Sequence, residues 1–425
     1  VGCQKEPPPQ VERPWAELPA TLASDNPQLR QGLGQLRREQ QLPFQWEKLQ
    51  LAANENAATV LAQAVDKVDC QALATVALSI LPEHGRRLSL VEQELAANFL
   101  ARHAELYQAS ARAAAMSDCS FGVDPAEGYA AQLNFIPQVR LAARLLALRA
   151  AQAVAEEESQ APANPISQAD LDAALDCLQG MFRWAQWMAR EPHVVCRIES
   201  VHLRGEACDS LQRLTQHRQL PTDSLRRFAA FLEKTLNDWP SDVETCQLDR
   251  VLGLQVYECI RTEKYEIAVS LDDLAADSSA LLKQVRKLKP EEIDRDQLFY
   301  LRHMEQLIQR ATGPLAARRQ ALSSMQREAE HLASQDQSPL IAVKLAFRDA
   351  ERMHQWLTWD RARAEAWQLA LTAAVGEKLP EKKSPYSGDA YRVVERPDHI
   401  AIWGHGALPG ELERPILVLR PMTQP

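Results

Sequence analysis

One stretch of the chain, HVVCRIESVH, holds several residue types that bind metals: His193, Cys196, Glu199 and His202 follow one another at steps of three. Imidazole, thiolate and carboxylate groups are the usual ligands of zinc. On a helix, each step of three residues advances about 300° around the axis, so the four side chains spread over roughly half of the circumference. They cannot converge on one ion. The spacing therefore predicts ordinary core and polar positions on a single helix.

Seven cysteines follow Cys3, and none is part of a C-x-x-C pair, so neither a zinc ribbon nor a thioredoxin-type motif is predicted. If the chain turns at Glu191-Pro192 between antiparallel helices, Cys177 and Cys208 lie at nearly the same height along the two helices, 14 and 17 residues from the turn. One expectation is a Cys177–Cys208 disulfide in an oxidising compartment. The other is that all seven are buried free thiols, which the odd count favours.

Two further groups could form a binding surface. Five tryptophans fall on predicted helices, at Trp184, Trp187, Trp356, Trp359 and Trp367. They could line an aromatic groove for a partner, but anchoring of helix packing is the commoner use. A basic stretch surrounds Pro221 and comprises Arg213, His217, Arg218, Arg226 and Arg227. In an acidic chain we expect these residues to form a solvated rim rather than a phosphate site.

The common catalytic and nucleotide-binding motifs are absent from the sequence, namely G-x-S-x-G, G-x-x-x-x-G-K-[ST], H-E-x-x-H and G-x-G-x-x-G. Nothing in the chain therefore nominates a nucleophile or a general base. We assign no catalytic residue, no cofactor and no metal ligand from the sequence.

Composition limits the fold class. A chain of 425 residues exceeds the roughly 250–300 at which one hydrophobic core stops growing, so we expect several domains or an elongated stack of helices. Hydrophobic residues make up 46%, aromatic residues only 6%, and there are 15 glycines, which favours helix over strand. The formal net charge of −9 gives no positive field, so we expect no nucleic-acid partner.

No apolar run is long enough to cross a membrane. The stretch LAARLLALRAAQAVA is interrupted by Arg144 and Arg149, well before the ~18–20 residues that a spanning helix requires.

Helical patterning extends from about Gln28 to Gly376, with breaks at glycine and proline clusters such as LPEHG, FGVDPAEG, APANPIS, REP and LPTD. One segment begins with Ser167 as a cap and Asp170 three residues later, continues with an apolar face, and ends at Glu191-Pro192. Pro192 suits the first turn of the next helix, which predicts an antiparallel hairpin. No repeat consensus is shared between segments, so we predict an irregular antiparallel array of helical hairpins.

The composition changes after Gly376. Five of the 15 glycines and seven of the 25 prolines lie in the last 50 residues, among the short β-type runs YRVV, HIAIW and PILVL. We therefore predict a mainly α fold with a small β-rich C-terminal appendage. The predicted domains are a tether (1–27), a helical array (28–375) and the β-rich module (376–425).

The N-terminal residues Val1-Gly2-Cys3 resemble the end of a bacterial lipobox, in which the cysteine receives a lipid when the signal peptide is removed. The sequence has no initiator methionine, and six of its 25 prolines lie in the first 27 residues, as in an extended tether. We predict lipidation of Cys3, so that an exported, periplasm-facing protein is held to a membrane by this N-terminal anchor. The alternative is a chance Gly-Cys pair.

Two stretches, CSFGVDPAEGYAAQLNFIPQVRLAARLLALRAAQAVAEEES and DLDAALDCLQGMFRWAQWMAREPHVVCRIESVHLRGEACDSLQRL, resemble a family of uncharacterised helical envelope proteins of planctomycete bacteria. The resemblance covers roughly residues 95–265. It rests on a Cys-aromatic-Asp loop, an R-x-x-A-R-L-L-A-L-R-A helix and a Glu-Pro turn. It implies export and an all-α body, and it implies no reaction.

The tail GEKLPEKKSPYSGDAYRVVERPDHIAIWGHGALPGELERPILVL is similar to the C-terminal module of that family and to the end of type II secretion pseudopilins. In pseudopilins the corresponding loop can hold calcium through acidic oxygens. Here the loop contains only Glu411 and Glu413, whereas calcium requires several oxygen ligands. The resemblance therefore implies a shared module shape and no calcium site.

These observations favour a lipid-anchored envelope protein that acts as a non-catalytic scaffold or binding module, with an envelope protein as a further partner. The alternatives are an envelope hydrolase, with a site assembled from dispersed residues in a groove between helices, and a subunit of a secretion-related assembly.

Overall fold

A computed structural model describes residues 24–38, 51–82, 85–123, 131–154, 168–263, 278–347, 349–407 and 412–421. Three features predicted from the sequence lie outside these residues: the lipidation site Cys3, most of the proline-rich tether, and the capping residue Ser167. Among the described residues, no helix is both long enough and apolar enough to cross a membrane.

The described helices are α1 (Pro27–Arg38), α2 (Ala57–Ala64), α3 (Cys70–Ile80), α4 (Leu90–Arg102), α5 (Ala104–Ala114), α6 (Ile136–Gln152), α7 (Gln168–Arg190), α8 (Val194–His217), α9 (Thr222–Asn237), α10 (Asp242–Arg261), α12 (Ser278–Val285), α13 (Pro290–Arg310), α14 (Leu315–Ala333), the π-helical turn η4 (Ala342–Ala346) and α15 (Ala350–Ala374). The strands are β1 (Arg392–Glu395), β2 (His399–Trp403) and β3 (Ile416–Leu419). The prediction of a mainly α fold with a small C-terminal sheet is confirmed.

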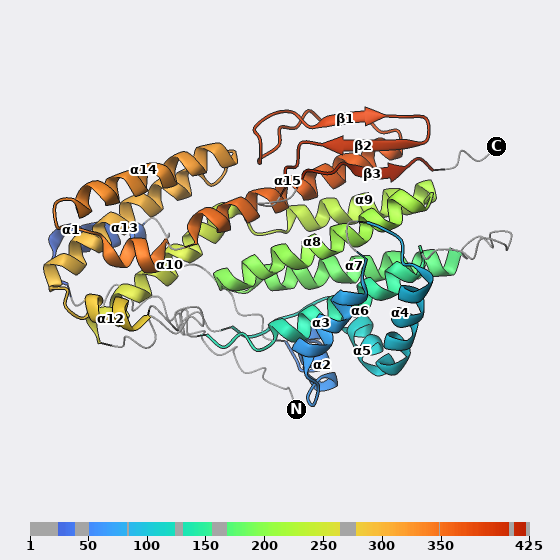
Figure 1. Cartoon of the computed structure of the whole chain (residues 1–425), viewed down its shortest axis with the longest axis horizontal. Coiled ribbons are helices and arrows are strands. Elements are labelled where there is room, and N and C mark those ends of the chain that lie inside the picture. The colour runs from blue at the N-terminus through green and yellow to red at the C-terminus, as the bar shows by residue number, and fades with distance from the viewer. Residues whose placement is uncertain are drawn as a thin grey trace, which may run out of the picture.

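Figure 1 shows how these elements are arranged. The helices α7, α8 and α15 run roughly along the long axis of the molecule. At one end, α2 to α6 lie on one side of them and the sheet lies on the other side, over α15. The other end is formed by α1, α10, α12, α13 and α14.

The predicted hairpin at Glu191-Pro192 is present, and α7 and α8 pack closely along their length. The apolar face of α7 is buried, including Phe182 and Trp184. The start of α8 differs from the expectation. His193 is its N-cap, because the imidazole Nδ1 accepts a hydrogen bond from the backbone N–H of Val195. Pro192 therefore lies in the turn before α8 rather than in the first turn of the helix.

The C-terminal sheet is an antiparallel meander in the order β1-β2-β3, with Ile402 paired to Val393 on one side and to Ile416 on the other. The outer edge of β3 is covered by α8. The side-chain amide of Gln212 pairs with Leu417 in both directions, at 3.2 and 3.4 Å, as a neighbouring strand would. This contact satisfies backbone groups that an open edge would leave unpaired.

The apolar residues form two large clusters. The first contains side chains of α2, α5 to α9, the C-terminal half of α15 and the sheet. The second contains side chains of α10, α13, α14, η4 and the N-terminal half of α15. The helices α8 and α15 contribute to both clusters. The sheet is therefore joined to the body through a shared core, and the two long helices connect the two ends of the molecule.

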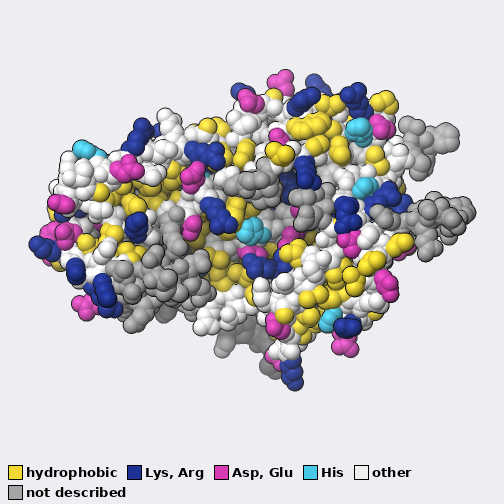
Figure 2. Space-filling view, viewed as in Figure 1, with side chains coloured by type: hydrophobic (Ala, Val, Ile, Leu, Met, Phe, Trp, Pro, Cys, Tyr) yellow, Lys and Arg dark blue, Asp and Glu magenta, His cyan; other side chains and the backbone are white. Residues whose placement is uncertain are grey.

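Hydrophobic side chains also gather on the surface. Figure 2 shows them as a stripe over the region of α3 and α4. Of the seven exposed large hydrophobic residues among those described, five lie on these two helices: Val76, Leu78, Leu90, Val91 and Leu95. Elsewhere on this face, acidic and basic side chains are interspersed.

Helices α10 and α13 make a close contact at Gly253. The hydroxyl of Tyr300 donates to the backbone carbonyls of Asp249 and Arg250 at 3.2 Å, and a methyl group at position 253 would overlap the phenol ring. Gly253 is therefore required for this contact.

We expect Gly253→Ala to lower the free energy of unfolding by more than about 1 kcal/mol, although alanine in a helix interior ordinarily stabilises by about that amount. Gly32→Ala in α1 is the matched control, because no atom lies within 4 Å of its added methyl group. Urea unfolding of both variants measures the two effects. Equal effects of the two substitutions would contradict the role given to Gly253.

Candidate functional site

One cleft is lined by α2, the 118–123 loop and the start of α6, and has a volume of about 930 Å³. We call it the α2–α6 cleft. This volume lies near the upper end of the range of about 300–1,000 Å³ that is typical of small-molecule sites. The FGVDPAEG stretch, noted in the sequence only as a helix break, supplies Phe121 and Gly122 to its lining.

The loop under the α2–α6 cleft is held at two points. At the first, the side-chain amide of Asn56 donates to the carbonyl of Ser120 at 2.9 Å and accepts from the N–H of Ser120 at 3.0 Å. At the second, the buried carboxylate of Glu191 accepts the N–H groups of Phe121 and Val123, at 2.8 and 3.2 Å. Because both anchors bind backbone, the loop has a fixed shape that depends little on its own side chains.

An aromatic column leads from the core to this cleft. Trp184 is fully buried, and its ring lies 6.4 Å from that of Phe121. Phe121 in turn stacks on Phe135 with a centroid separation of 4.3 Å and an interplanar angle of 13°. Both phenylalanines line the cleft and are partly exposed. The column therefore presents aromatic surface to whatever occupies the cleft.

The rim of the α2–α6 cleft is polar. Thr59 and Gln63 come from α2, Asp66 from the turn that follows it, and Gln138 from α6. Among the described residues of the lining there is no lysine or arginine, and Asp66 is the one ionisable side chain. The cleft thus offers amide and hydroxyl groups beside an aromatic surface, without a cation.

A second cleft, of about 600 Å³, lies between α8, α15 and the loop that joins β2 to β3. We call it the body–sheet cleft. In it, Arg363 donates to the carboxylate of Asp209 at 2.5 Å and lies 5.1 Å from the ring of Trp359. His405 donates through Nε2 to the carbonyl of Arg414 at 2.9 Å, since a carbonyl can only accept. Burial lowers the pKa of His405, and the nearby charge of Arg363 acts in the same direction.

The described part of the loop between β2 and β3 is organised by one carboxylate. The carboxylate of Glu413 accepts the N–H groups of Gly404 and Gly406, at 2.6 and 3.1 Å. Both glycines have a positive φ, and a methyl group at 406 would overlap the ring of Tyr386. Glu413 therefore organises the backbone of the loop. No group of three or more metal-ligating side chains occurs among the described residues.

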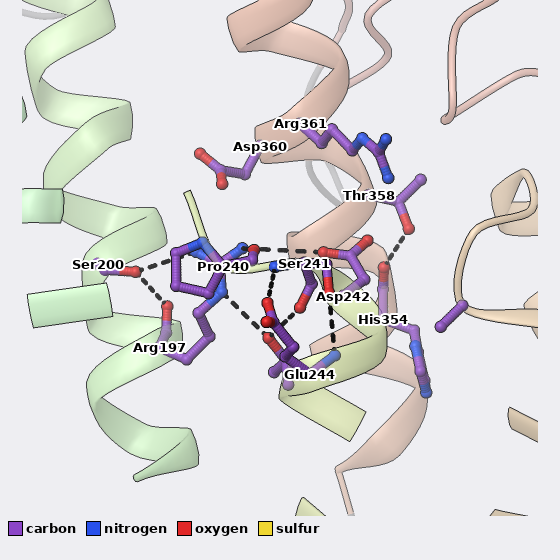
Figure 3. Close-up of polar contacts among 12 residues, drawn as sticks. Arg197, Ser200, Pro240, Ser241, Asp242, Glu244, His354, Thr358, Asp360 and Arg361 are labelled. Atoms are coloured by element: carbon purple, nitrogen blue, oxygen red, sulfur yellow. Dashed lines mark hydrogen bonds and ion pairs between the residues drawn. The ribbon is translucent and has the colours of Figure 1, made fainter. Parts of the chain in front are cut away.

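A buried charge junction lies where α8, α10, α14 and α15 meet. Figure 3 shows three of its residues, Arg197, Asp242 and Asp360. Its guanidinium groups are those of Arg197 and Arg204 on α8 and Arg318 on α14, and its carboxylates are those of Asp242 on α10 and Asp360 on α15. None of the five residues is more than 3% exposed.

The junction is closed by short contacts between helices. Arg204 binds the carboxylate of Asp360 in a bidentate manner, at 2.7 and 2.5 Å. Arg318 donates to Asp242 at 2.7 Å, and Arg197 lies 3.8 Å from the other oxygen of the same carboxylate. The guanidinium of Arg204 also stacks on Trp239 at 3.6 Å. Burial lowers the pKa of Arg197 to about 10, which shows how far this group is removed from water.

His354 lies beside this junction, with both ring nitrogens buried and without a hydrogen-bond partner. Burial lowers its pKa to about 4, and the charge of Arg318 adds to this effect while Asp242 opposes it. The imidazole is therefore neutral at physiological pH.

The residues of the HVVCRIESVH stretch do not converge, as their spacing predicted. His193 caps α8, and Cys196 is buried in the core. Glu199 binds Arg140 of α6 in a bidentate manner, at 2.6 and 2.5 Å. His202 lies 3.6 Å from Glu199 and packs against Trp356.

The structure does not join Cys177 and Cys208, which are both buried free thiols. The thiol of Cys177 lies 3.8 Å from the hydroxyl of Tyr107 on α5. Cys208 instead lies near the charges of Arg363 and Arg204, on the side of α8 that faces α15. The expected Cys177–Cys208 disulfide is absent from this structure, because equal height along a hairpin does not place two side chains on facing sides.

The five tryptophans and the basic residues around Pro221 differ in how far they are buried. Four of the five tryptophans are buried among helices, at Trp184, Trp187, Trp359 and Trp367.

The expectation of a solvated basic rim is wrong for Arg213, which is buried and donates to the carbonyls of Pro82 and Arg86. Arg226 and Arg227 are exposed, as expected.

Sequence reasoning did not find Asn56, Phe121, Phe135 or Gln138 as site residues. One signal was present, since Phe121 lies in the loop that carries the resemblance to envelope proteins. The stacking of Phe121 on Phe135 depends on the path of the loop, which no periodic pattern encodes.

Comparison with known proteins gave no match to any family model, curated protein or solved structure.

We expect His354 to make the fold acid-sensitive. Its pKa of about 4 in the folded state lies below the ordinary value of about 6.5, so the unfolded chain takes up a proton first as the pH falls. The free energy of unfolding should therefore decrease between pH 6.5 and pH 4, by about 3 kcal/mol from this residue. Denaturant titrations at several pH values should show a shallower decrease for His354→Leu than for the parent. Parallel curves for a His354→Leu variant that is folded at pH 8 would contradict this assignment.

Proposed function

We propose that the chain is a non-catalytic binding module of the cell envelope, held to a membrane surface by a lipid on Cys3. The observation that carries the binding role is the α2–α6 cleft. Its loop is fixed by Asn56 and Glu191, its aromatic surface is supported by Trp184 in the core, and its rim side chains face solvent. A site prepared in this way loses little free energy to ordering when a ligand binds.

The same geometry favours binding over hydrolysis. A hydrolase of the serine or histidine type needs a base that is oriented by a carboxylate, beside a space for the substrate. Among the residues that line the two described clefts, no serine or histidine is hydrogen-bonded to a carboxylate. His405 is the one histidine in these linings, and its N–H is committed to the carbonyl of Arg414.

The membrane anchor rests on the Val-Gly-Cys motif and the prolines that follow it. One acyl chain gives only weak membrane binding, whereas a lipidated N-terminal cysteine carries several. A proline-rich tether of this kind would leave the helical body free to meet a partner in the envelope. A role within a secretion assembly would rest on the C-terminal tail alone.

Labelling of native cells with a palmitate analogue tests the anchor. We expect label in the full-length product and none in its Cys3→Ser variant. If neither protein is labelled, the lipid anchor is contradicted. The proposed binding role of the α2–α6 cleft is not affected by that result.

Photo-crosslinking tests the binding role. We expect a photoreactive phenylalanine analogue at Gln63, on the rim of the α2–α6 cleft, to capture an envelope component in native cells. The same analogue at Gln335, an exposed position beyond the end of α14, is the matched control and should capture nothing specific. Identical patterns from the two positions would contradict a binding role for the cleft.

A further inference from the structure

We propose that the α2–α6 cleft binds a neutral oligosaccharide. This inference rests on the proposed binding function and names the chemical class of the ligand.

The charge of the lining excludes other classes first. A phosphate or carboxylate ligand is ordinarily held by arginine, lysine or a cluster of backbone N–H groups. Of the lining residues that the structure describes, none is arginine or lysine, and the one charge is the carboxylate of Asp66. The N–H groups of Ser120, Phe121 and Val123 are already taken by Asn56 and Glu191. An anionic ligand would therefore lose its hydration without compensation.

The aromatic surface gives the second argument. An aromatic face is electron-rich and attracts the weakly positive hydrogens of C–H groups. A sugar ring has such a C–H face, and its hydroxyl groups point outward around the edge. The Phe121–Phe135 stack is held from beneath by Trp184, so it offers a platform that does not have to be ordered on binding.

The rim gives the third argument. Each sugar hydroxyl both donates and accepts hydrogen bonds, and an amide side chain does the same. Gln63 and Thr59 on α2, Gln138 on α6 and Ser120 in the loop bring such groups to the cleft from three elements. A nucleobase presents its polar atoms along fewer edges, so some of the rim amides and hydroxyls would have no hydrogen-bond partner on it. A ligand with polar groups all around an apolar face fits better.

Isothermal titration of the full chain with neutral oligosaccharides of the chitin, cellulose and starch types tests the inference. We expect at least one type to bind, with a dissociation constant between micromolar and millimolar. Phe135→Ala should weaken this binding by about tenfold or more, and Phe135→Tyr should restore it. Gln138→Ala should weaken it without removing an aromatic ring, so that the test holds even if Phe135→Ala is unstable. Gln335→Ala is the control and should bind as the parent does.

Three results would overturn the inference. The first is an absence of binding by every type at millimolar concentration. The second is binding that Phe135→Ala and Gln138→Ala leave unchanged, which would place the sugar elsewhere on the chain. The third is tighter binding of a polyanion, lost in the same two variants. The photoreactive group at position 63 could instead capture a protein while no oligosaccharide binds. That result would support the proposed binding function and contradict the oligosaccharide as its ligand.

Discussion

The pairing of Arg204 with Asp360 and of Arg318 with Asp242 is the constraint on which the rest of the structure depends. These ions lie where the two apolar clusters meet, and almost no water reaches them. Burying an ion costs several kcal/mol, and only a well-oriented counter-ion offsets that cost. Each pair therefore fixes the position of one long helix against another: α8 against α15, and α14 against the start of α10. A junction of this kind specifies geometry more than it adds stability.

Nearer the surface, single polar side chains fix loops and turns by binding their backbone groups. Glu191 lies in the turn between α7 and α8 and holds the 118–123 loop, and Glu413 holds the loop between β2 and β3. Arg213 holds the turn around Pro82 in the same way. The walls of the α2–α6 cleft thus follow from the α7–α8 hairpin, because the hairpin positions the carboxylate that shapes the loop.

Local pattern predicted much of this fold and little of the cleft. The periodicity of apolar residues and the glycine and proline breaks predicted the helices, the α7–α8 hairpin and the C-terminal sheet. Sequence reasoning left two readings for Cys177 and Cys208, and the structure has both as free thiols. Sequence distance from a turn gives height along a helix and not the direction of a side chain. The expectation of a solvated rim failed for Arg213, since only the folded path of the chain brings the carbonyl of Pro82 within reach. Phe121 and Phe135 meet for the same reason, through a loop without periodicity.

The distribution of polar groups finally bears on what kind of chemistry this chain can perform. The buried imidazole of His193, the buried carboxylate of Glu191 and the exposed carboxylate of Glu413 bind backbone groups, and the buried carboxylate of Asp360 binds an arginine. Groups committed in this way lack the freedom to exchange protons with a substrate, because the fold would lose a contact at each step. The described polar side chains of the α2–α6 cleft are amides, hydroxyls and the carboxylate of Asp66. Amides and hydroxyls beside the Phe121–Phe135 stack suit recognition of a ligand, and the proposal of a binding module rests on them.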